Sequence, residues 1–206
     1  MDALANNFLI IYVDGDACPV KNEIYRVAER HKIFTKVISN SLMSVPNTSL
    51  IELTVVSKES DAVDDWIVEH ILKGDIVVTA DIPLAARCIE KNAKVLCPNG
   101  KVRDPQNIGS DLAMRDLMED IRITDEIRQM HKPFSKQDRI RFLNALEKIV
   151  FTKFKKLEKL KLFLEKLNQP LFVRMTGSGS VLVAYYQRKQ DCELAKVRFK
   201  RKFKNY

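Results

Sequence analysis

The sequence predicts an α/β fold with a doubly wound, mainly parallel sheet flanked by helices. Short apolar runs of strand length alternate with segments of helical periodicity. Several of these runs are apolar throughout, which is typical of parallel strands that are buried on both faces. The 206 residues, 46% of them hydrophobic and with 6 glycines and 7 prolines, have the balance of a globular protein with one or two domains.

Five apolar runs have the length and composition of strands. They cover residues 8–13, 35–40, 50–56, 75–80 and 95–97. The first and the fourth run end directly before an aspartate, Asp14 and Asp81 respectively.

Helices are expected between these strands and after the last one. Pro19 and Ser60 stand where a helix begins, and Gly74 stands where one ends. Ser135 and Asp138 have the spacing of a helix cap. We expect one helix that starts at residue 19 and four more over residues 61–72, 83–91, 108–122 and 135–150.

The net charge of +8 is distributed unevenly along the chain. Residues 1–150 contain 20 Lys and Arg against 23 Asp and Glu, a net charge of −3. Residues 151–206 contain 15 Lys and Arg against 4 Asp and Glu, a net charge of +11. The division predicts a domain over residues 1–150 and a small basic α+β extension over residues 151–206.

The extension predicts a short series of elements of its own. These are a helix over residues 151–167, a Gly/Ser turn over 175–180, a strand over 181–186 and a basic helix over 192–203. Two interpretations of its basic residues stay open, namely a solvated face or a surface that binds nucleic-acid backbones without reading their sequence.

The composition also predicts the compartment. No run reaches the roughly 18 apolar residues of a membrane span, and the N-terminus lacks the basic start and long apolar core of a signal peptide. The four cysteines contain no CxxC pair, so they indicate neither a disulfide framework nor a zinc site. We therefore expect a cytoplasmic protein with no membrane partner.

Acidic residues gather where predicted strands end. Asp14 and Asp16 follow the first strand and Asp81 follows the fourth. Ligands of open α/β sheets bind at this carboxyl edge, so the sequence predicts a site there. Asp81 also has a structural interpretation, as the N-cap of the next helix.

The helix after the third strand adds further acids. Asp61 and Asp65 are four residues apart and share one face of that helix, and Asp64 lies beside this face. Unpaired carboxylates that converge in one crevice repel one another, so such a cluster usually holds a cation. Ligands that are all oxygen favour Mg²⁺ or Mn²⁺, whose chemistry is the hydrolysis of phosphodiesters or phosphomonoesters.

Five segments, in this order, resemble the YaiI/YqxD family of uncharacterised proteins. The resemblance runs from about residue 9 to residue 150 and continues through Pro133-Phe134-Ser135 and Arg139. The segments are VDGDACPVK (13–21), SNS (39–41), DAVDDWI (61–67), VVTADIPLAARC (77–88) and LAMRDLM (112–118).

The family is similar to the PIN/NYN-like metal-dependent nucleases. The resemblance implies a PIN-like sheet, an Mg²⁺ or Mn²⁺ cofactor and RNA as the substrate. It also implies roles for site residues: the metal ligands would be Asp14, Asp61, Asp65 and Asp81, and Asn40 would line the site. Asp16 or a metal-bound water would handle the proton.

Arg87 faces either solvent or the acidic crevice, where it would bind a substrate phosphate. The domain's own net charge is slightly negative, so RNA binding would depend on the metal and on local Arg and Lys residues.

Two alternatives to a nuclease stay open. The segment from Asp14 to Cys18 is similar to the first motif of haloacid-dehalogenase-like phosphatases, although Cys18 replaces Thr or Val and the later acid pair is reduced to Asp81. In such an enzyme Asp14 would be the nucleophile and Asp16 the general acid. The other alternative is a module that binds nucleic acid or nucleotide without catalysis.

The extension has a resemblance of its own. Residues 172–185 resemble the Gly/Ser loop of GHMP kinases, most closely that of cytidyl-methylerythritol kinase, and the likeness covers about residues 160–206. The ATP-phosphate motif and the catalytic acid region of those enzymes are absent, so kinase activity is not expected.

Overall fold

The computed structural model describes residues 9–16, 18–122, 134–153, 155–175 and 182–203. The chain divides into two compact units, Met1–Ile149 (unit 1) and Val150–Tyr206 (unit 2), which are described separately. Most of the predicted Gly/Ser turn, residues 176–180, lies outside the described residues. No helix among those that the structure describes has the length and hydrophobicity needed to cross a membrane.

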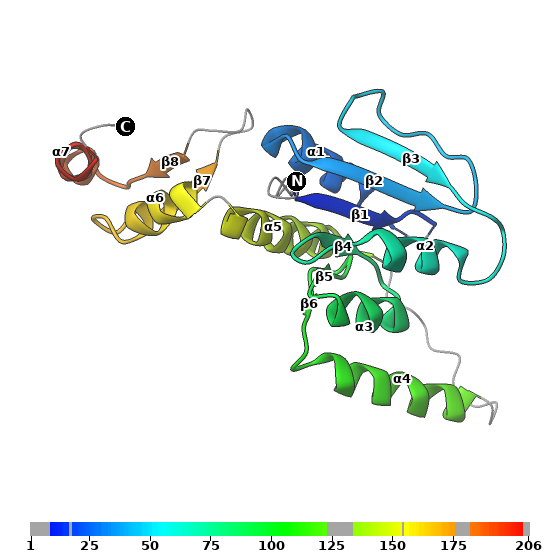
Figure 1. The fold of residues 1–206 in the computed structure, drawn as a ribbon. Helices are drawn as coiled ribbons and strands as arrows, with labels where there is room; N and C mark the ends of the chain where they lie inside the picture. Colours follow the sequence, from blue (N-terminus) through cyan, green and yellow to red (C-terminus); the bar gives the residue numbers. More distant parts are fainter. Residues whose placement is uncertain (1–8, 17, 123–133, 154, 176–181, 204–206) are drawn as a thin grey trace, which may run out of the picture. The chain divides into compact units, whose positions relative to one another are not determined.

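Unit 1 is built on a six-stranded sheet with the order β3-β2-β1-β4-β5-β6 (Figure 1). Five strands are parallel: β1 (Ile10–Asp14), β2 (Phe34–Ser39), β3 (Ile51–Val55), β4 (Ile76–Val78) and β5 (Lys94–Leu96). β6 (Val102–Arg103) is antiparallel to β5 and is too short to stand out in the sequence. The predicted α/β, doubly wound, mainly parallel fold is confirmed.

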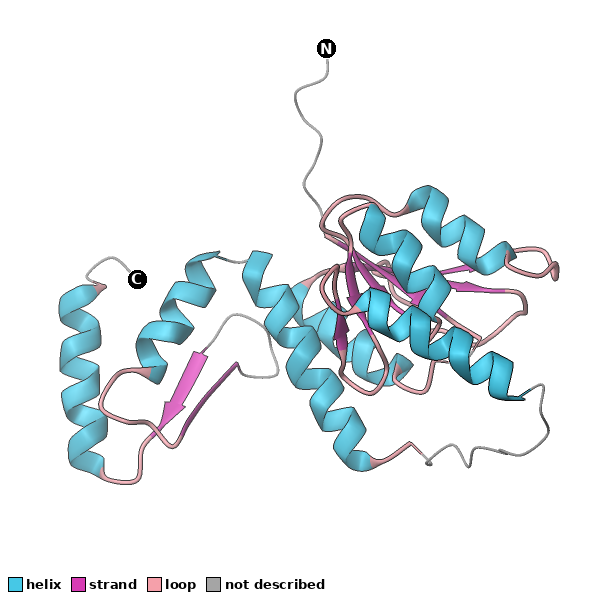
Figure 2. Cartoon of the chain, turned by 90° about the horizontal axis from the view of Figure 1, so that it is seen from below, coloured by secondary structure: helices cyan, strands magenta, loops and turns pink. Residues whose placement is uncertain are grey.

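Helices cover both faces of this sheet (Figures 1 and 2). The helices that the structure describes in unit 1 are α1 (Lys21–His31), α2 (Ala62–His70), α3 (Ile82–Glu90), α4 (Ile108–Arg122) and α5 (Lys136–Lys153), whose last four residues belong to unit 2. α2 and α3 lie on one face, and α4 packs against α3. α1 and α5 are joined by two ion pairs, Arg139–Glu23 and Arg30–Glu147.

Alternation along β1 explains why the predicted strands are apolar throughout. Tyr12 packs with Ile67 of α2 and Leu84 of α3 in one buried cluster. Its neighbours Ile11 and Val13 are fully buried and point to the opposite face of the sheet. A strand with helices on both sides has no polar face.

The start and end of α2 differ from the prediction. Ser60 does not cap the helix, because its hydroxyl bonds the Asp61 side chain and Asp61 takes the N-cap position with a positive φ of 64°. The helix also ends at His70, before Gly74, because the following residue is extended and the N–H of Leu72 bonds the buried Asp75 carboxylate. α1 likewise begins two residues after Pro19, at Lys21.

Two other caps follow the predicted pattern. The Asp81 carboxylate accepts a hydrogen bond of 2.7 Å from the N–H of Leu84 and caps α3. Ser135 and Asp138 bond each other's backbone N–H groups at the start of α5, at 2.9 and 3.1 Å. α5 continues to Lys153, three residues beyond the predicted end.

Unit 2 is a small α+β unit, as the sequence predicts. Its elements are α6 (Lys155–Glu165), the antiparallel pair β7 (Phe172–Met175) and β8 (Leu182–Tyr185), and α7 (Lys189–Lys202). The rings of Phe163, Phe199 and Phe203 pack together, with centroids 5.0 to 6.2 Å apart, and join α6 to α7. β7 was not predicted, and α7 begins three residues before the predicted helix.

Candidate functional site at the carboxyl edge of the sheet

The strand order creates a crevice between β1 and β4. The chain passes outward from β1 through β2 to β3, and then returns to the other side of β1 to form β4 and β5. The adjacent ends of β1 and β4 are therefore the point at which the winding reverses, where doubly wound proteins bind ligands. Asp14 is the last residue of β1, Thr79 follows β4 directly, and Asp81 comes two residues after Thr79.

Thr79 joins the two aspartates that the sequence places at this point. Its hydroxyl donates to Asp14 Oδ2 at 2.9 Å and accepts from the N–H of Asp81 at 3.0 Å. Asp81 uses Oδ1 to cap α3, while Oδ2 has no hydrogen bond from a described residue. Asp81 is therefore both the cap and an exposed acid at the crevice.

The environment of Asp14 opposes its negative charge. Burial raises the pKa of Asp14 above its usual value, and the nearby charges of Asp16 and Asp81 raise it further. The hydrogen bond from Thr79 lowers it in part. Asp14 is therefore the centre of a group of carboxylates that repel one another.

Asp64 is the helix residue that joins this group most closely. Burial raises its pKa to about 6, and the charges of Asp81, Asp14 and Asp61 raise it in the same direction. Its carboxylate receives no hydrogen bond from a described residue. Asp64 is absent from the ligand set that the resemblance implies, although it lies three and seven residues before Ile67 and Ile71, which are both buried. That spacing places it on the inward face of α2 and is the signal that could have identified it.

Asp65 and Arg87, two of the predicted site residues, bond each other instead. Arg87 Nη2 lies 2.6 Å from Asp65 Oδ1; the Asp65 side chain is largely exposed and that of Arg87 is partly exposed. The Arg87 charge also lowers the pKa of Asp64, although less strongly than burial raises it. The structure thus places Arg87 beside the acidic group but turns Asp65 toward solvent.

Asp61 lies at the margin of the group. It is exposed, accepts a hydrogen bond of 3.3 Å from Ser60 Oγ, and contributes to the raised pKa of Asp64. Asp14, Asp64 and Asp81 therefore form one electrostatic group, in which Asp16 acts on Asp14 and Asp61 acts on Asp64.

Asp16 and Asn40 hold the loop after β1 to the end of β2. Ser39 Oγ donates to Asp16 Oδ1, and the backbone N–H of Asn40 donates to Asp16 Oδ2 at 3.3 Å. Gly15 lies so close to this strand that a Cβ there would be 2.7 Å from the carbonyl oxygen of Ile38. Lys21 completes the loop, with its ammonium 2.9 Å from the carbonyl oxygen of Gly15.

The carboxylate oxygens match a hard divalent cation in their chemistry, but in this structure their spacing does not match one. All are carboxylate oxygens, which Mg²⁺ and Mn²⁺ prefer. Among the residues that the structure describes, however, no three His, Cys, Asp or Glu side chains are arranged to hold a metal ion. Coordination by Asp14, Asp64 and Asp81 therefore requires their side chains to rotate toward a common centre.

Comparison with known proteins assigns the family. The family described as "Uncharacterized BCR, YaiI/YqxD family" matches residues 12–152. No solved structure matches the chain.

Several relatives are similar over the same part of the chain. A UPF0178 protein of Azorhizobium caulinodans is 50% identical over 139 residues, which are 68% of this chain and 87% of the relative. A UPF0178 protein of Gluconacetobacter diazotrophicus is 50% identical over 140 residues, 68% of this chain and 91% of the relative. A UPF0178 protein of Rhodopseudomonas palustris is 52% identical over 137 residues, 66% of this chain and 84% of the relative. The chain belongs to the YaiI/YqxD family.

Proposed function

We propose that unit 1 is a cytoplasmic, Mg²⁺- or Mn²⁺-dependent nuclease that hydrolyses phosphodiester bonds of RNA. The observation that supports this proposal is the group of Asp14, Asp64 and Asp81 at the β1–β4 crevice. No described cation bonds these three carboxylates, and burial raises the pKa values of Asp14 and Asp64. Repulsion between these carboxylates lowers the stability of the fold, and a bound cation would restore that stability.

Each acid has a distinct part in the proposed site. Asp14, Asp64 and Asp81 would hold the cation, with Asp61 as a further negative charge at the margin. Asp65 stays in its ion pair with Arg87. A divalent cation bound there would polarise a phosphoryl oxygen and favour the ionisation of water.

Other side chains of unit 1 would orient the metal ligands, accept a proton and contact the substrate. Thr79 fixes the direction of the Asp14 carboxylate through its hydroxyl. Asp16, whose oxygens each accept one described hydrogen bond, retains lone pairs that can receive the proton of the attacking water. Arg87 and Asn40, on either side of the acids, would contact the RNA.

The test is an assay of the full-length protein with Mn²⁺ or Mg²⁺ on single-stranded RNA, duplex RNA and a phosphomonoester. We expect cleavage of RNA that falls at least about 100-fold in Asp14→Asn and in Asp81→Asn, because each variant removes a charge from the reacting centre. Asn is as good a helix cap as Asp, so Asp81→Asn keeps α3 intact. Asp116→Asn, at an exposed acid of α4, is the matched control and should cleave normally.

Other outcomes identify the alternatives. Turnover of the monoester with a trapped phosphate on Asp14 would establish the phosphatase instead. Metal binding without hydrolysis of any of the three substrates would establish the non-catalytic binding module.

A further inference from the structure

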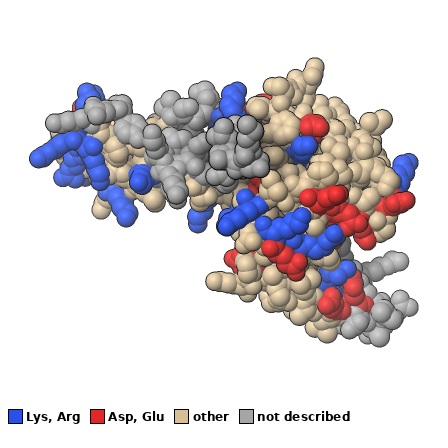
Figure 3. Space-filling model, viewed as in Figure 1, with Lys and Arg blue, Asp and Glu red and all other residues tan. Residues whose placement is uncertain are grey.

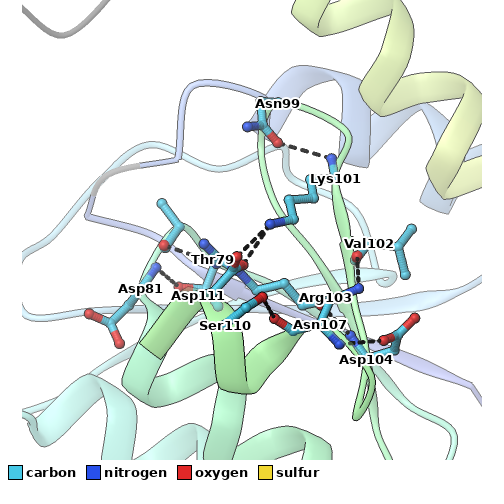
Figure 4. A network of polar contacts seen from close by, with 11 residues as sticks. Thr79, Asp81, Asn99, Lys101, Val102, Arg103, Asp104, Asn107, Ser110 and Asp111 are labelled. Carbon is cyan, nitrogen blue, oxygen red and sulfur yellow. Dashed lines mark hydrogen bonds and ion pairs between the residues drawn. The ribbon is translucent and has the colours of Figure 1, made fainter. Parts of the chain in front are cut away.

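A network of polar side chains lies beside Asp81 and is not used by the proposed mechanism (Figure 4). Lys101 lies in the turn between β5 and β6, and its Nζ is 2.6 and 2.8 Å from the two oxygens of Asp111 on α4. Arg103 of β6 donates from Nε to Asp111 Oδ2 at 3.0 Å. Two cations therefore share one carboxylate, which leaves an excess of one positive charge.

The three side chains differ in exposure. Arg103 is 10% exposed and Asp111 16%, whereas Lys101 is 46% exposed. An ammonium has three N–H donors, and Asp111 provides acceptors for two of them. Lys101 is therefore the member of the network that can reach a ligand, while Arg103 and Asp111 are committed to internal contacts.

Arg103 connects the network to the acids. Its Nη1 donates at 3.1 Å to the carbonyl oxygen of Ala80, the residue between Thr79 and Asp81. Thr79 in turn bonds Asp14 and the N–H of Asp81. Hydrogen bonds and the intervening backbone thus link Lys101 to Asp14 across α4, β6 and the turn after β4.

The turn that carries Lys101 is also fixed in place. The N–H of Cys97 bonds the carbonyl oxygen of Lys101 at 2.8 Å, and Asn99 Oδ1 accepts from the N–H of Lys101 at 2.9 Å. β5 pairs directly with β4, so this turn lies at the same sheet edge as Asp81. Among the described cations near the acids, Arg87 pairs with Asp65 and Lys21 donates to the carbonyl oxygen of Gly15. Lys101 therefore adds a cation on the β5 side of the acids to Arg87 on the α3 side.

We propose that Lys101 is a phosphate-binding residue of this site, held in position by Asp111, and that Arg103 is a positioning residue for both Lys101 and the Asp81 turn. The inference rests on the proposed function and specifies how an acidic edge accepts an anionic substrate. The ammonium contacts a non-bridging oxygen of an RNA phosphate as a point charge.

The principal test compares the kinetics of Lys101→Met with those of Lys94→Met in the full-length protein. Lys94 is an exposed lysine at the opposite end of β5 and serves as the matched control. We expect Lys101→Met to raise KM for single-stranded RNA about tenfold with little change in kcat, since binding to the phosphate is lost in ground and transition state alike. Lys101→Arg should restore most of the affinity, and Lys94→Met should change neither constant.

Salt dependence gives a second readout. Loss of one phosphate contact lowers the slope of log affinity against log salt by about 0.7 for a single strand. Lys101→Met should show this change and Lys94→Met should not. Arg103→Lys keeps the charge but loses the planar fork that joins Ala80 to Asp111, so it should lower kcat through the Asp81 turn and also raise KM through Lys101.

A binding measurement separates this inference from the proposed function. Uridine 5′-monophosphate is titrated into each protein, with uridine as the control that lacks the phosphate, and binding is followed by NMR. If RNA is not cleaved but the nucleotide binds and Lys101→Met weakens it, hydrolysis is refuted and the phosphate site stands. If RNA is cleaved and Lys101→Met keeps the wild-type KM and salt slope, the phosphate site is refuted and the nuclease stands. A wild-type protein that binds neither RNA nor the nucleotide refutes both.

Discussion

Units 1 and 2 use charge in opposite ways. Unit 1 has a net charge of −3 and brings acids and bases into contact at the carboxyl edge of its sheet, whereas unit 2 has a net charge of +11 distributed along its helices. Figure 3 shows red and blue side chains next to each other on unit 1 and mainly blue ones on α7. The difference follows from the hydrophobic cores. Strands buried on both faces make unit 1 stable enough to tolerate carboxylates that repel one another.

The cores themselves differ most. Phe142 of α5 is fully buried in unit 1, whereas Phe199 of α7 is only partly buried in unit 2. Phe142→Ala should destabilise unit 1 by about 3–5 kcal/mol, and Phe199→Ala should cost unit 2 clearly less. Denaturant unfolding measures both, with Trp66, the single tryptophan, reporting on unit 1. Equal losses of stability in the two variants would show that the two cores do not differ in packing.

The turn at Gly100 tests how tightly α5 closes on unit 1. Gly100 has a φ of +88°, and a Cβ there would lie 2.7 Å from the backbone of Arg141. Gly100→Ala should therefore cost about 1–3 kcal/mol in thermal or denaturant unfolding. Gly109→Ala on α4 meets no atom within 4 Å and should be neutral or slightly stabilising. If both variants changed the stability by the same amount, this account of the contact between Gly100 and α5 would be wrong.

The cost of the acidic group is measurable at Asp64. Its pKa of about 6 lies above the ordinary aspartate value of 3.8, so the folded state favours the protonated form and loses stability as the pH rises through this range. Without metal, Asp64→Asn should stabilise unit 1 by about 1 kcal/mol at pH 8, after allowance for solvent screening. The gain should vanish near pH 3.5, and Asp116→Asn should show no such gain. A gain that is the same at both pH values would refute electrostatic repulsion as its cause.

The smallest effect is expected from removing unit 2. Truncation after Lys153 keeps α5 whole and removes most of the positive charge. The Trp66 unfolding transition should move by less than about 0.5 kcal/mol, as for changes remote from a core. RNA cleavage should also continue. Loss of either would mean that unit 1 depends on the basic extension.

The sequence predicts most of the sheet because each strand is a local apolar run with a clear end. Asp14 and Asp81 follow from those ends without knowledge of the packing. The choice between Asp64 and Asp65 is less direct, because neighbouring helix residues differ by about 100°. It depends on giving the spacing of Asp64 from the buried Ile67 and Ile71 more weight than the i,i+4 spacing of Asp61 and Asp65.

Other features depend on contacts between distant segments. β6 has two residues and exists because it pairs with β5. The bonds of Lys101 and Arg103 to Asp111 join segments that no local pattern connects. Ser60 fails as a cap because the left-handed conformation of Asp61 starts the helix one residue later.

The pairing of β1 with β4 also determines when the site can form. Asp14 and Thr79 are 65 residues apart, and β2, β3 and α2 lie between them in the chain. Contacts at such separation form late, because the loop must close before they contribute. A nascent chain on the ribosome therefore carries Asp14 long before it has Asp81, and later still Lys101. Under the proposed function, a growing chain therefore cannot assemble the metal site until β4 and the turn after it have been synthesised.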